Sequence, residues 1–364
     1  MEKIRLKGGK IFDGEKFFCA DIQIENGKIT AVEPIAERES QKGGAPLNDG
    51  LCIDVTDCIV TSGLVDIHGH FSEMGNAEFG FPADLSCIPF GVTYAVDACA
   101  VRSDPSVLES LRVETKVFIP VCICDGKLDT VEMQKLLDEY GERAIGIKVY
   151  FDESLQNGTT EEIFQAACEF ARERGLKVMV HSSYSPTSML KIVQTLKRGD
   201  ILTHSYHGGV HSIDENGYIA YHTAKEKGVV VDAGMAGGVH TDFEVLKKAI
   251  ENGCIPDTIS SDITKFSAYK RGGIYGLTVC MSILKNLEMD EIKIFQAVTK
   301  NAAESVGQKE WFSTLSVGQK ATLCVLRYGE SAIDMTDKAG NRLAIHQGYL
   351  CKMTMKNGQI LYRN

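Results

Sequence analysis

Long apolar runs are missing from this sequence. A helix that crosses a membrane needs roughly 18 or more consecutive apolar residues, and no stretch of the 364 residues approaches that length. The first residues, Met1 to Lys7, interleave charged and apolar side chains, which is not the pattern of a secretory signal peptide. We therefore expect neither a transmembrane segment nor a signal peptide.

Clusters of lysine and arginine are missing as well. The sequence has 39 basic and 49 acidic residues, a formal net charge of -10 at pH 7, and its basic residues gather on no single segment. Nucleic acids and anionic membranes attract positively charged surfaces. We therefore expect neither as a partner, and we expect the ligand to be a small-molecule substrate.

Two further patterns are absent. The glycine-rich stretches Gly234–Val239 and Arg271–Gly273 do not have the spacing of a phosphate-binding loop, so no nucleotide cofactor is expected. The 12 cysteines are scattered without a regular framework. In a long chain this distribution favours reduced thiols over disulfides, and it predicts a cytoplasmic location.

Both ends of the chain have the pattern of short strands joined by turns. Strand-like runs flank the dipeptides Asn26-Gly27 and Asn357-Gly358, and Asn-Gly between such runs is a strong hairpin signal. We predict that residues 1–60 and 313–364 together form a small β-sandwich domain. Its predicted strands are Lys3–Leu6, Lys10–Phe12, Asp21–Ile24, Lys28–Val32, Ala321–Arg327, Tyr349–Lys356 and Gln359–Tyr362.

Residues 61–312 alternate apolar, β-branched runs with helical stretches. The predicted strands are Leu64–Ile67, Val92–Asp97, Lys116–Val121, Ile145–Tyr150, Lys177–His181, Ile201–His204, Val229–Asp232 and Thr258–Asp262. The clearest helices are Thr160–Arg174, Ser185–Lys197 and Asp242–Glu251. Eight predicted strands that alternate with helices or long loops are typical of an α/β fold of the (β/α)8, or TIM, barrel type.

Side chains that bind metals stand at the ends of these predicted strands. His68 and His70 end the first strand two residues apart, so their rings share a face, and His181, His204 and Asp262 end three later strands. Because the carboxyl ends of barrel strands meet at one mouth, these side chains should converge there. Each histidine taken alone would also fit a hydrogen-bonded core position. Together they predict a centre with two divalent metal ions that share a hydroxide.

Lys148 lies inside the apolar run Gly146–Tyr150. A buried ammonium is costly unless it is paired or loses its proton. A neutral lysine can take up carbon dioxide as a carbamate, a carboxylate-like group that would bridge two metal ions. The alternative is a lysine whose ammonium reaches solvent from the strand end.

Other residues near the same mouth are weaker candidates. Asp262 could also move a proton from water to the leaving group, or it could serve as a capping residue. His207 and His240, in the loops after the sixth and seventh strands, and Cys99, at the end of the second strand, could contact substrate. Solvated loop histidines and a packed thiol are the alternatives. Asp66 could support the site from the first strand, or it could have a structural role.

With these residues in place, the chain resembles the amidohydrolase superfamily over nearly its whole length. The resemblance rests on Gly63–His70, Lys148, Thr203-His204, Asp262 and the late segment Leu315–Lys320. It implies a (β/α)8 barrel beside a small β-sandwich, hydrolysis of amide or ester bonds, and a binuclear centre that we expect to hold zinc. By the same resemblance, His68, His70 and Asp262 bind the more buried ion, and His181 and His204 bind the more exposed ion. A carbamylated Lys148 bridges the two ions.

Within the superfamily the chain is most similar to the deacetylase branch, which is also called dihydroorotase-like, in Gly146–Val149 and Asp200–His204. True dihydroorotases have an arginine two residues after the second histidine to hold a carboxylate, whereas Phe71-Ser72 follows here. Relatives tend to have a histidine after the seventh strand, where this chain has Met235, and another polar residue where it has Thr264. We therefore expect substrate recognition to differ from that of the relatives.

These observations predict a metal-dependent hydrolase of a small acylated molecule, an N-acyl compound or an acylated acid. One alternative is a cyclic amidohydrolase that opens rings of the hydantoin or dihydroorotate type. Another is a non-catalytic barrel that serves as a binding module. Barrels of this family are commonly oligomers, so a homo-oligomer is expected.

Overall fold

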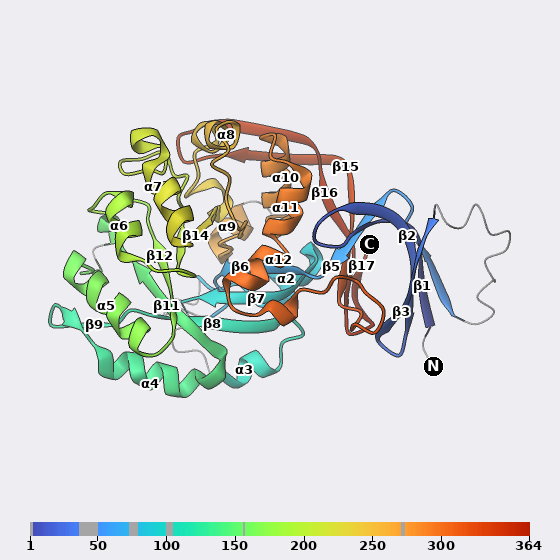
Figure 1. The fold of residues 1–364 in the computed structure, drawn as a ribbon, viewed down its shortest axis with the longest axis horizontal. Helices are drawn as coiled ribbons and strands as arrows, with labels where there is room; N and C mark the ends of the chain where they lie inside the picture. The colour runs from blue at the N-terminus through green and yellow to red at the C-terminus, as the bar shows by residue number, and fades with distance from the viewer. Residues whose placement is uncertain (1–2, 36–49, 73–78, 100–104, 156, 271–273) are drawn as a thin grey trace.

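The computed structural model describes residues 3–35, 50–72, 79–99, 105–155, 157–270 and 274–364. The chain forms two large sheets (Figure 1), a parallel sheet from the middle of the sequence and a second sheet from strands of both ends. Within the described residues, no helix combines the length and the apolar character needed to cross a membrane.

The parallel sheet is the wall of the predicted barrel. Its strands run in the order β14-β13-β12-β11-β8-β7-β6, and every neighbouring pair is parallel. The bounds of these strands are β6 Leu64–Gly69, β7 Val92–Ala98, β8 Glu114–Pro120, β11 Ala144–Tyr150, β12 Lys177–His181, β13 Ile201–Thr203 and β14 Val230–Asp232. A two-stranded hairpin, β9 (Ile123–Cys124) and β10 (Lys127–Leu128), follows β8.

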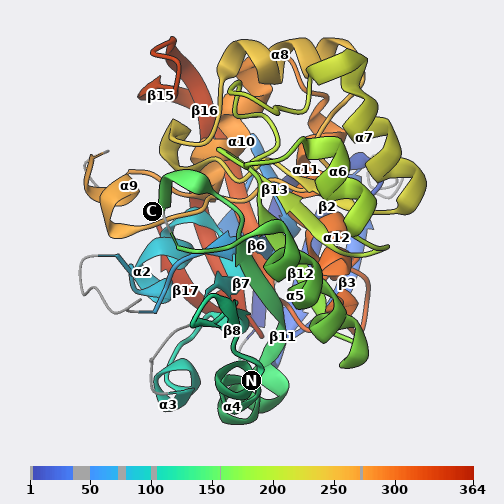
Figure 2. The ribbon, with the colours of Figure 1, turned by 90° about the vertical axis from the view of Figure 1, so that its left-hand side faces the viewer.

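Helices surround this sheet, as the side view in Figure 2 makes clear. Their bounds are α2 Ala83–Cys87, α3 Pro105–Glu109, α4 Thr130–Tyr140, α5 Glu161–Glu173, α6 Met189–Thr195, α7 Glu215–Lys227, α8 Phe243–Glu251, α9 Lys265–Lys270, α10 Leu277–Asn286, α11 Glu291–Ala297 and α12 Lys300–Ser305. The three helices that the sequence predicted correspond to α5, α6 and α8.

The local sequence explains where these elements begin and end. The hydroxyl of Thr160 accepts a hydrogen bond from the backbone N–H of Ile163 and caps α5, and Gly175, with φ of +65°, follows its end. Asn26 and Gly27, with φ of 51° and 76°, form the hairpin turn that the dipeptide predicted.

The barrel closes without a regular eighth strand, so the prediction of a strand at Thr258–Asp262 was wrong in form. This segment joins its two neighbours by isolated bridges, from Thr258 to Asp232 and from Ile263 to Gly69. Two positive φ angles account for the difference. Asp262 has φ of 48° and Gly234, after β14, has φ of 52°, so neither backbone stays extended long enough for a ladder. The segment still lies between β14 and β6, because the N–H of Asp262 donates to the carbonyl of His68 (2.7 Å).

The second sheet has eight strands, most of them in the order β17-β16-β15-β5-β1-β2-β3, with β4 paired to β1. Their bounds are β1 Lys3–Phe12, β2 Phe17–Glu25, β3 Lys28–Pro34, β4 Leu51–Asp54, β5 Cys58–Ser62, β15 Leu323–Thr336, β16 Arg342–Lys356 and β17 Gln359–Arg363. A sheet built from both ends of the chain is thus confirmed. It is one hydrogen-bonded sheet with its own apolar cluster, while domain boundaries at residues 60 and 313 stay a prediction.

Two strands of this sheet are much longer than the sequence predicted. β15 and β16 pair from Leu323 with Met355 as far as Thr336 with Arg342, whereas the predicted strands Ala321–Arg327 and Tyr349–Lys356 cover only the part nearest the sheet. The extra length carries the hairpin away from the terminal sheet and along the barrel to α8 (Figure 1). The turn of this hairpin therefore lies beside the barrel.

Candidate metal centre

The six side chains that the sequence selected as metal ligands are all buried at one end of the barrel strands. They come from five places in the wall: His68 in β6 and His70 just after it, Lys148 in β11, His181 at the end of β12, His204 directly after β13, and Asp262 in the segment Thr258–Asp262, the closing segment of the barrel. The strand pattern was the signal that predicted this convergence, because parallel barrel strands share one carboxyl end.

Asp262 lies at the centre of the first group of potential ligands. One of its oxygens, Oδ1, is 2.9 Å from Nε2 of His70 and 3.3 Å from Nε2 of His68, and Oδ2 is 3.7 Å from Nε2 of His204. The amine nitrogen of Lys148 is 3.0 Å from Nε2 of His68. His68, His204 and Asp262 each offer one ligand atom, and these atoms lie within 4.8 Å of one another.

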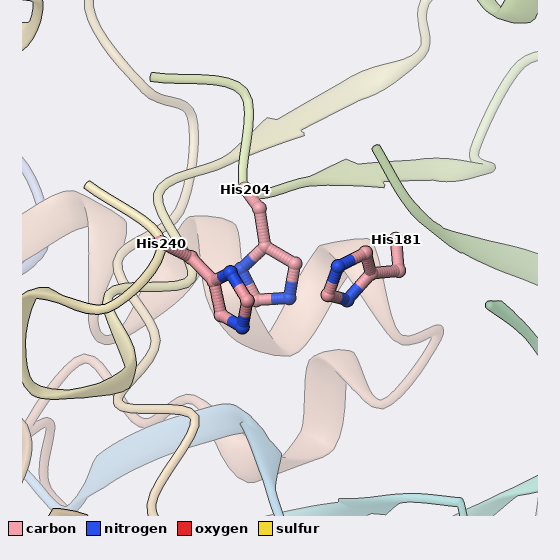
Figure 3. Close-up of side chains that lie close together, drawn as sticks. All are labelled: His181, His204 and His240. Atoms are coloured by element: carbon pink, nitrogen blue, oxygen red, sulfur yellow. The ribbon is translucent and has the colours of Figure 1, made fainter. Parts of the chain in front are cut away.

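A second group of three imidazoles lies next to the first and shares His204 with it. His181, His204 and His240 offer nitrogens within 4.8 Å of one another, and Figure 3 shows the three rings turned toward one space. Their centroids are 4.3 to 4.8 Å apart. Ser183 joins two of them, because its hydroxyl oxygen is 2.7 Å from Nε2 of His181 and 3.1 Å from Nδ1 of His240.

Hydrogen bonds orient the rings of His204 and His68 so that Nε2 of each faces the site. Nδ1 of His204 lies 2.6 Å from the carbonyl oxygen of Gly234, and a carbonyl can only accept, so Nδ1 carries the proton. Nδ1 of His68 lies 3.1 Å from the hydroxyl oxygen of Thr203, which itself donates to Asp232. Both rings therefore have the proton on Nδ1 and the lone pair on Nε2, as metal-binding histidines do.

Burial shifts the pKa of three ionisable groups of the site toward the neutral forms that metal binding requires. It lowers the pKa of His68 to about 4, with the charge of Lys148 adding to the effect, and it lowers the pKa of His240 to about 3. These rings are neutral at pH 7 and have a free lone pair. Burial also lowers the pKa of Lys148 to about 8, so its neutral amine is available near neutral pH.

Asp232 holds the wall of the site together, and the sequence analysis missed it. Its carboxylate accepts hydrogen bonds from the hydroxyls of Thr203 (2.7 Å), Thr258 (2.8 Å) and Ser260 (2.6 Å). Asp232 itself lies in β14, and these three residues belong to β13 and to the closing segment. One buried carboxylate therefore joins three neighbouring pieces of the barrel. Its position at the end of a predicted strand was the signal that could have found it.

Asp66 has the structural role that the sequence left open. Its carboxylate accepts from the backbone N–H of Ser261 at 3.1 Å and from the hydroxyl of the same residue. The carbonyl of Ser261 in turn accepts from the hydroxyl of Tyr275 (2.6 Å). Asp66 therefore ties β6 to the closing segment, and burial raises the pKa of its carboxyl to about 7.

The donor set fits divalent metal ions. Neutral imidazoles and a carboxylate are the ligands that zinc and similar ions take in proteins, and here they form two adjacent groups that share one residue. Nδ1 of His70 is buried and has no hydrogen-bond partner among the described residues, so no such partner competes with an ion for this nitrogen.

The family is decided by the match of residues 59–361 to the profile described as the Amidohydrolase family. This chain belongs to the amidohydrolase family. Amidohydrolases are hydrolases that act on C–N bonds, and they generally use a divalent metal centre, which agrees with the two ligand groups at the barrel mouth.

Known proteins similar to this amidohydrolase include two bacterial deacetylases and a dihydroorotase. A deacetylase of Enterococcus faecalis is 27% identical in an alignment that covers 93% of this chain and 98% of the relative. A deacetylase of Agrobacterium fabrum is 25% identical in an alignment that covers 87% of this chain and 80% of the relative. The crystal structure of a dihydroorotase superposes with a TM-score of 0.84 at 22% identity and covers 99% of this chain and 98% of its own, which shows the fold.

The sequence predicted departures from the branch pattern at Met235 and Thr264. Met235 is fully buried, and the same loop brings His240 to His181 and His204. The hydroxyl of Thr264 accepts from the N–H of Ser267 (3.1 Å) at the start of α9.

The remaining weak candidates differ in what they contact. Cys99, directly after β7, is buried, and burial raises the pKa of its thiol to about 12. It belongs to neither ligand group found among the described residues. His207, after β13, is also buried, so it is not the solvated loop histidine that the sequence allowed as an alternative.

Proposed function

We propose that this amidohydrolase is a metal-dependent hydrolase that removes an acyl group from a small molecule, as a deacetylase does. The observation that carries the proposal is the pair of adjacent ligand groups, His68–His204–Asp262 and His181–His204–His240, at the mouth of a barrel. The deacetylases similar to this chain support the reaction type.

We assign the ligands as follows. His68, His70 and Asp262 hold one ion; His181 and His204 hold the other, with His240 as a third imidazole. Zinc suits this donor set. Lys148, whose amine lies 3.0 Å from Nε2 of His68, would bind both ions as a carbamate. Its lowered pKa and complete burial favour the neutral amine that reacts with carbon dioxide.

The chain's own residues orient the substrate and move protons. Ions held by these residues would supply a hydroxide nucleophile and polarise the acyl carbonyl. Asp262 accepts the proton of the nucleophile at a carboxylate oxygen and delivers it to the leaving nitrogen or oxygen. Asp232, through Thr203, holds His68 in the tautomer that faces the site. We also propose a cytoplasmic location, since all 12 cysteines are free thiols.

The test compares three proteins on a panel of N-acetyl amines, N-acetyl amino acids and acetyl esters, with acetate release as the measurement. The Asp262→Asn variant keeps the size of the side chain but loses the proton acceptor, so turnover should fall about 100-fold or more. Asp138→Asn is the matched control, because Asp138 is exposed on α4 and contacts Gln134. It should retain wild-type turnover.

Three results would contradict the proposal. Consumption of a hydantoin or dihydroorotate without release of acetate from any panel member would indicate a ring-opening enzyme. An Asp262→Asn variant with the turnover of the wild type would remove Asp262 from the mechanism, and a metal-loaded wild type without turnover on rings or acyl compounds would indicate a binding module.

A further inference from the structure

The long hairpin of β15 and β16 brings a lysine to the side of the metal site. Lys338 stands in its turn, where its backbone N–H donates to the carbonyl of Thr241 (3.1 Å), next to His240. The neighbouring Asp337 accepts from the N–H of Phe243 (2.7 Å) at the start of α8. These two bonds fix the turn of the hairpin against the loop that carries His240.

The ammonium of Lys338 has no acceptor among the described residues. Its nitrogen is buried without a hydrogen-bond partner there, and it lies 3.8 Å from the centroid of the Tyr184 ring. Tyr184 directly follows Ser183, whose hydroxyl lies between His181 and His240. A buried cation without an anion costs free energy that pairing restores.

A second buried donor without an acceptor among the described residues belongs to a ring near Lys338. Nδ1 of His207 accepts a hydrogen bond from the backbone N–H of Gly209 (3.1 Å). The proton of the neutral ring is therefore on Nε2, and Nε2 is buried without a partner among the described residues. Burial, with the charge of Lys338, lowers the pKa of His207 to about 3, so the ring stays neutral.

Gly209 lies close to both the His207 ring and Lys338. A Cβ atom on this glycine would lie 3.2 Å from Nδ1 of His207 and 3.4 Å from the ammonium nitrogen of Lys338, so the ring and the ammonium group border the same small space. The carboxylates nearby are already engaged. Asp337 accepts from Phe243 and from Asn341, and Asp152 pairs with His181 at 3.0 Å and accepts from Ser154.

We propose that Lys338 and His207 bind a carboxylate of the substrate, so that the acylated molecule is an acylated acid such as an N-acyl amino acid. This inference rests on the proposed deacylation and adds the substrate class to it. One cation and one neutral N–H match a singly charged carboxylate, whereas phosphate usually takes more donors. The arginine that holds a carboxylate in dihydroorotases is absent here, and Lys338 comes from a different part of the chain.

The test uses metal-loaded full-length protein and matched substrates. Each N-acetyl amino acid is paired with its carboxamide, which keeps the scissile bond but removes the charge. In Lys338→Met, KM for the acids should rise roughly tenfold to hundredfold, the range for a lost charge-assisted hydrogen bond, while KM for the carboxamides stays unchanged. Lys338→Arg should retain part of the preference. Lys248→Met, an exposed lysine on α8, is the control of equal charge.

Binding without turnover gives an independent readout. N-methanesulfonyl amino acids resist hydrolysis, and calorimetry should show the acids binding more tightly than their carboxamides to the wild type but equally to Lys338→Met. An equal effect of Lys338→Met on acids and carboxamides, or no effect, would overturn the proposal, as would stronger competition by inorganic phosphate than by acetate. If the sulfonamide acids depend on Lys338 while no N-acetyl compound is hydrolysed, the proposed function fails and the carboxylate site stands.

Discussion

Replacing Asp232 with alanine should destabilise the barrel and weaken the metal site together. The carboxylate is completely buried and accepts from Thr203, Thr258 and Ser260 at 2.6 to 2.8 Å. A hydrogen bond to a charged group contributes about 1.5–3 kcal/mol. The three hydroxyls can rotate toward other acceptors after the substitution, so we expect a loss of about 3–5 kcal/mol, less than the full sum.

The assay is urea unfolding at fixed pH, followed by circular dichroism, on apoprotein so that metal binding does not contribute. Asp334→Ala is the matched control, because Asp334 lies on the exposed part of β15 and pairs with Arg342. An exposed ion pair contributes less than about 1 kcal/mol. Equal stability of the two variants would refute the reasoning that Asp232 joins β13, β14 and the closing segment.

The same substitution should also lower metal affinity, through the side chain of Thr203. Without Asp232 the hydroxyl of Thr203 loses its acceptor and is free to turn away from Nδ1 of His68, which lies 3.1 Å away. Loss of such an outer partner typically costs 10–100-fold in metal affinity. Competition with a chelator of known affinity measures this, and an unchanged affinity would show that His68 is held by other contacts.

The remaining predictions concern His240 and Gly234. His240→Gln should leave one ion bound as in the wild type and weaken the other by about tenfold or more, which titration with cobalt and its visible absorption spectrum would resolve. Equal loss of both ions would contradict the assignment. Gly234→Ala should lower both stability and metal content, because its Cβ would lie 2.6 Å from Nδ1 of His204 and closer still to Thr203, and because Gly234 has φ of +52°. If Gly234→Ala had the unfolding temperature and metal content of the wild type, the loop would adjust freely and the prediction would be wrong.

The sequence was informative where a local pattern determines structure. Strands that alternate with helices place the end of each strand at one mouth, so His68, Lys148, His181 and His204 could be selected before any distance was known. The Asn26-Gly27 hairpin and the Thr160 cap are likewise decided within a few residues.

Features that depend on contacts between distant segments were not accessible in this way. The role of Asp232 needs two adjacent pieces of wall, and the role of Lys338 needs a hairpin that extends from another sheet to the barrel. His240 stood in a loop whose path no periodic pattern predicts. The closing segment failed as a predicted strand because Asp262 adopts φ of 48°, which an apolar run of residues does not reveal.

A two-ion centre bridged by a modified lysine is tested most directly by one measurement. Metal content per chain is determined by elemental analysis, together with the intact mass under gentle conditions after supply of zinc and bicarbonate. We expect about two ions per chain and a carbon dioxide adduct that is lost in Lys148→Met. One ion or none, without an adduct, would contradict the bridged centre.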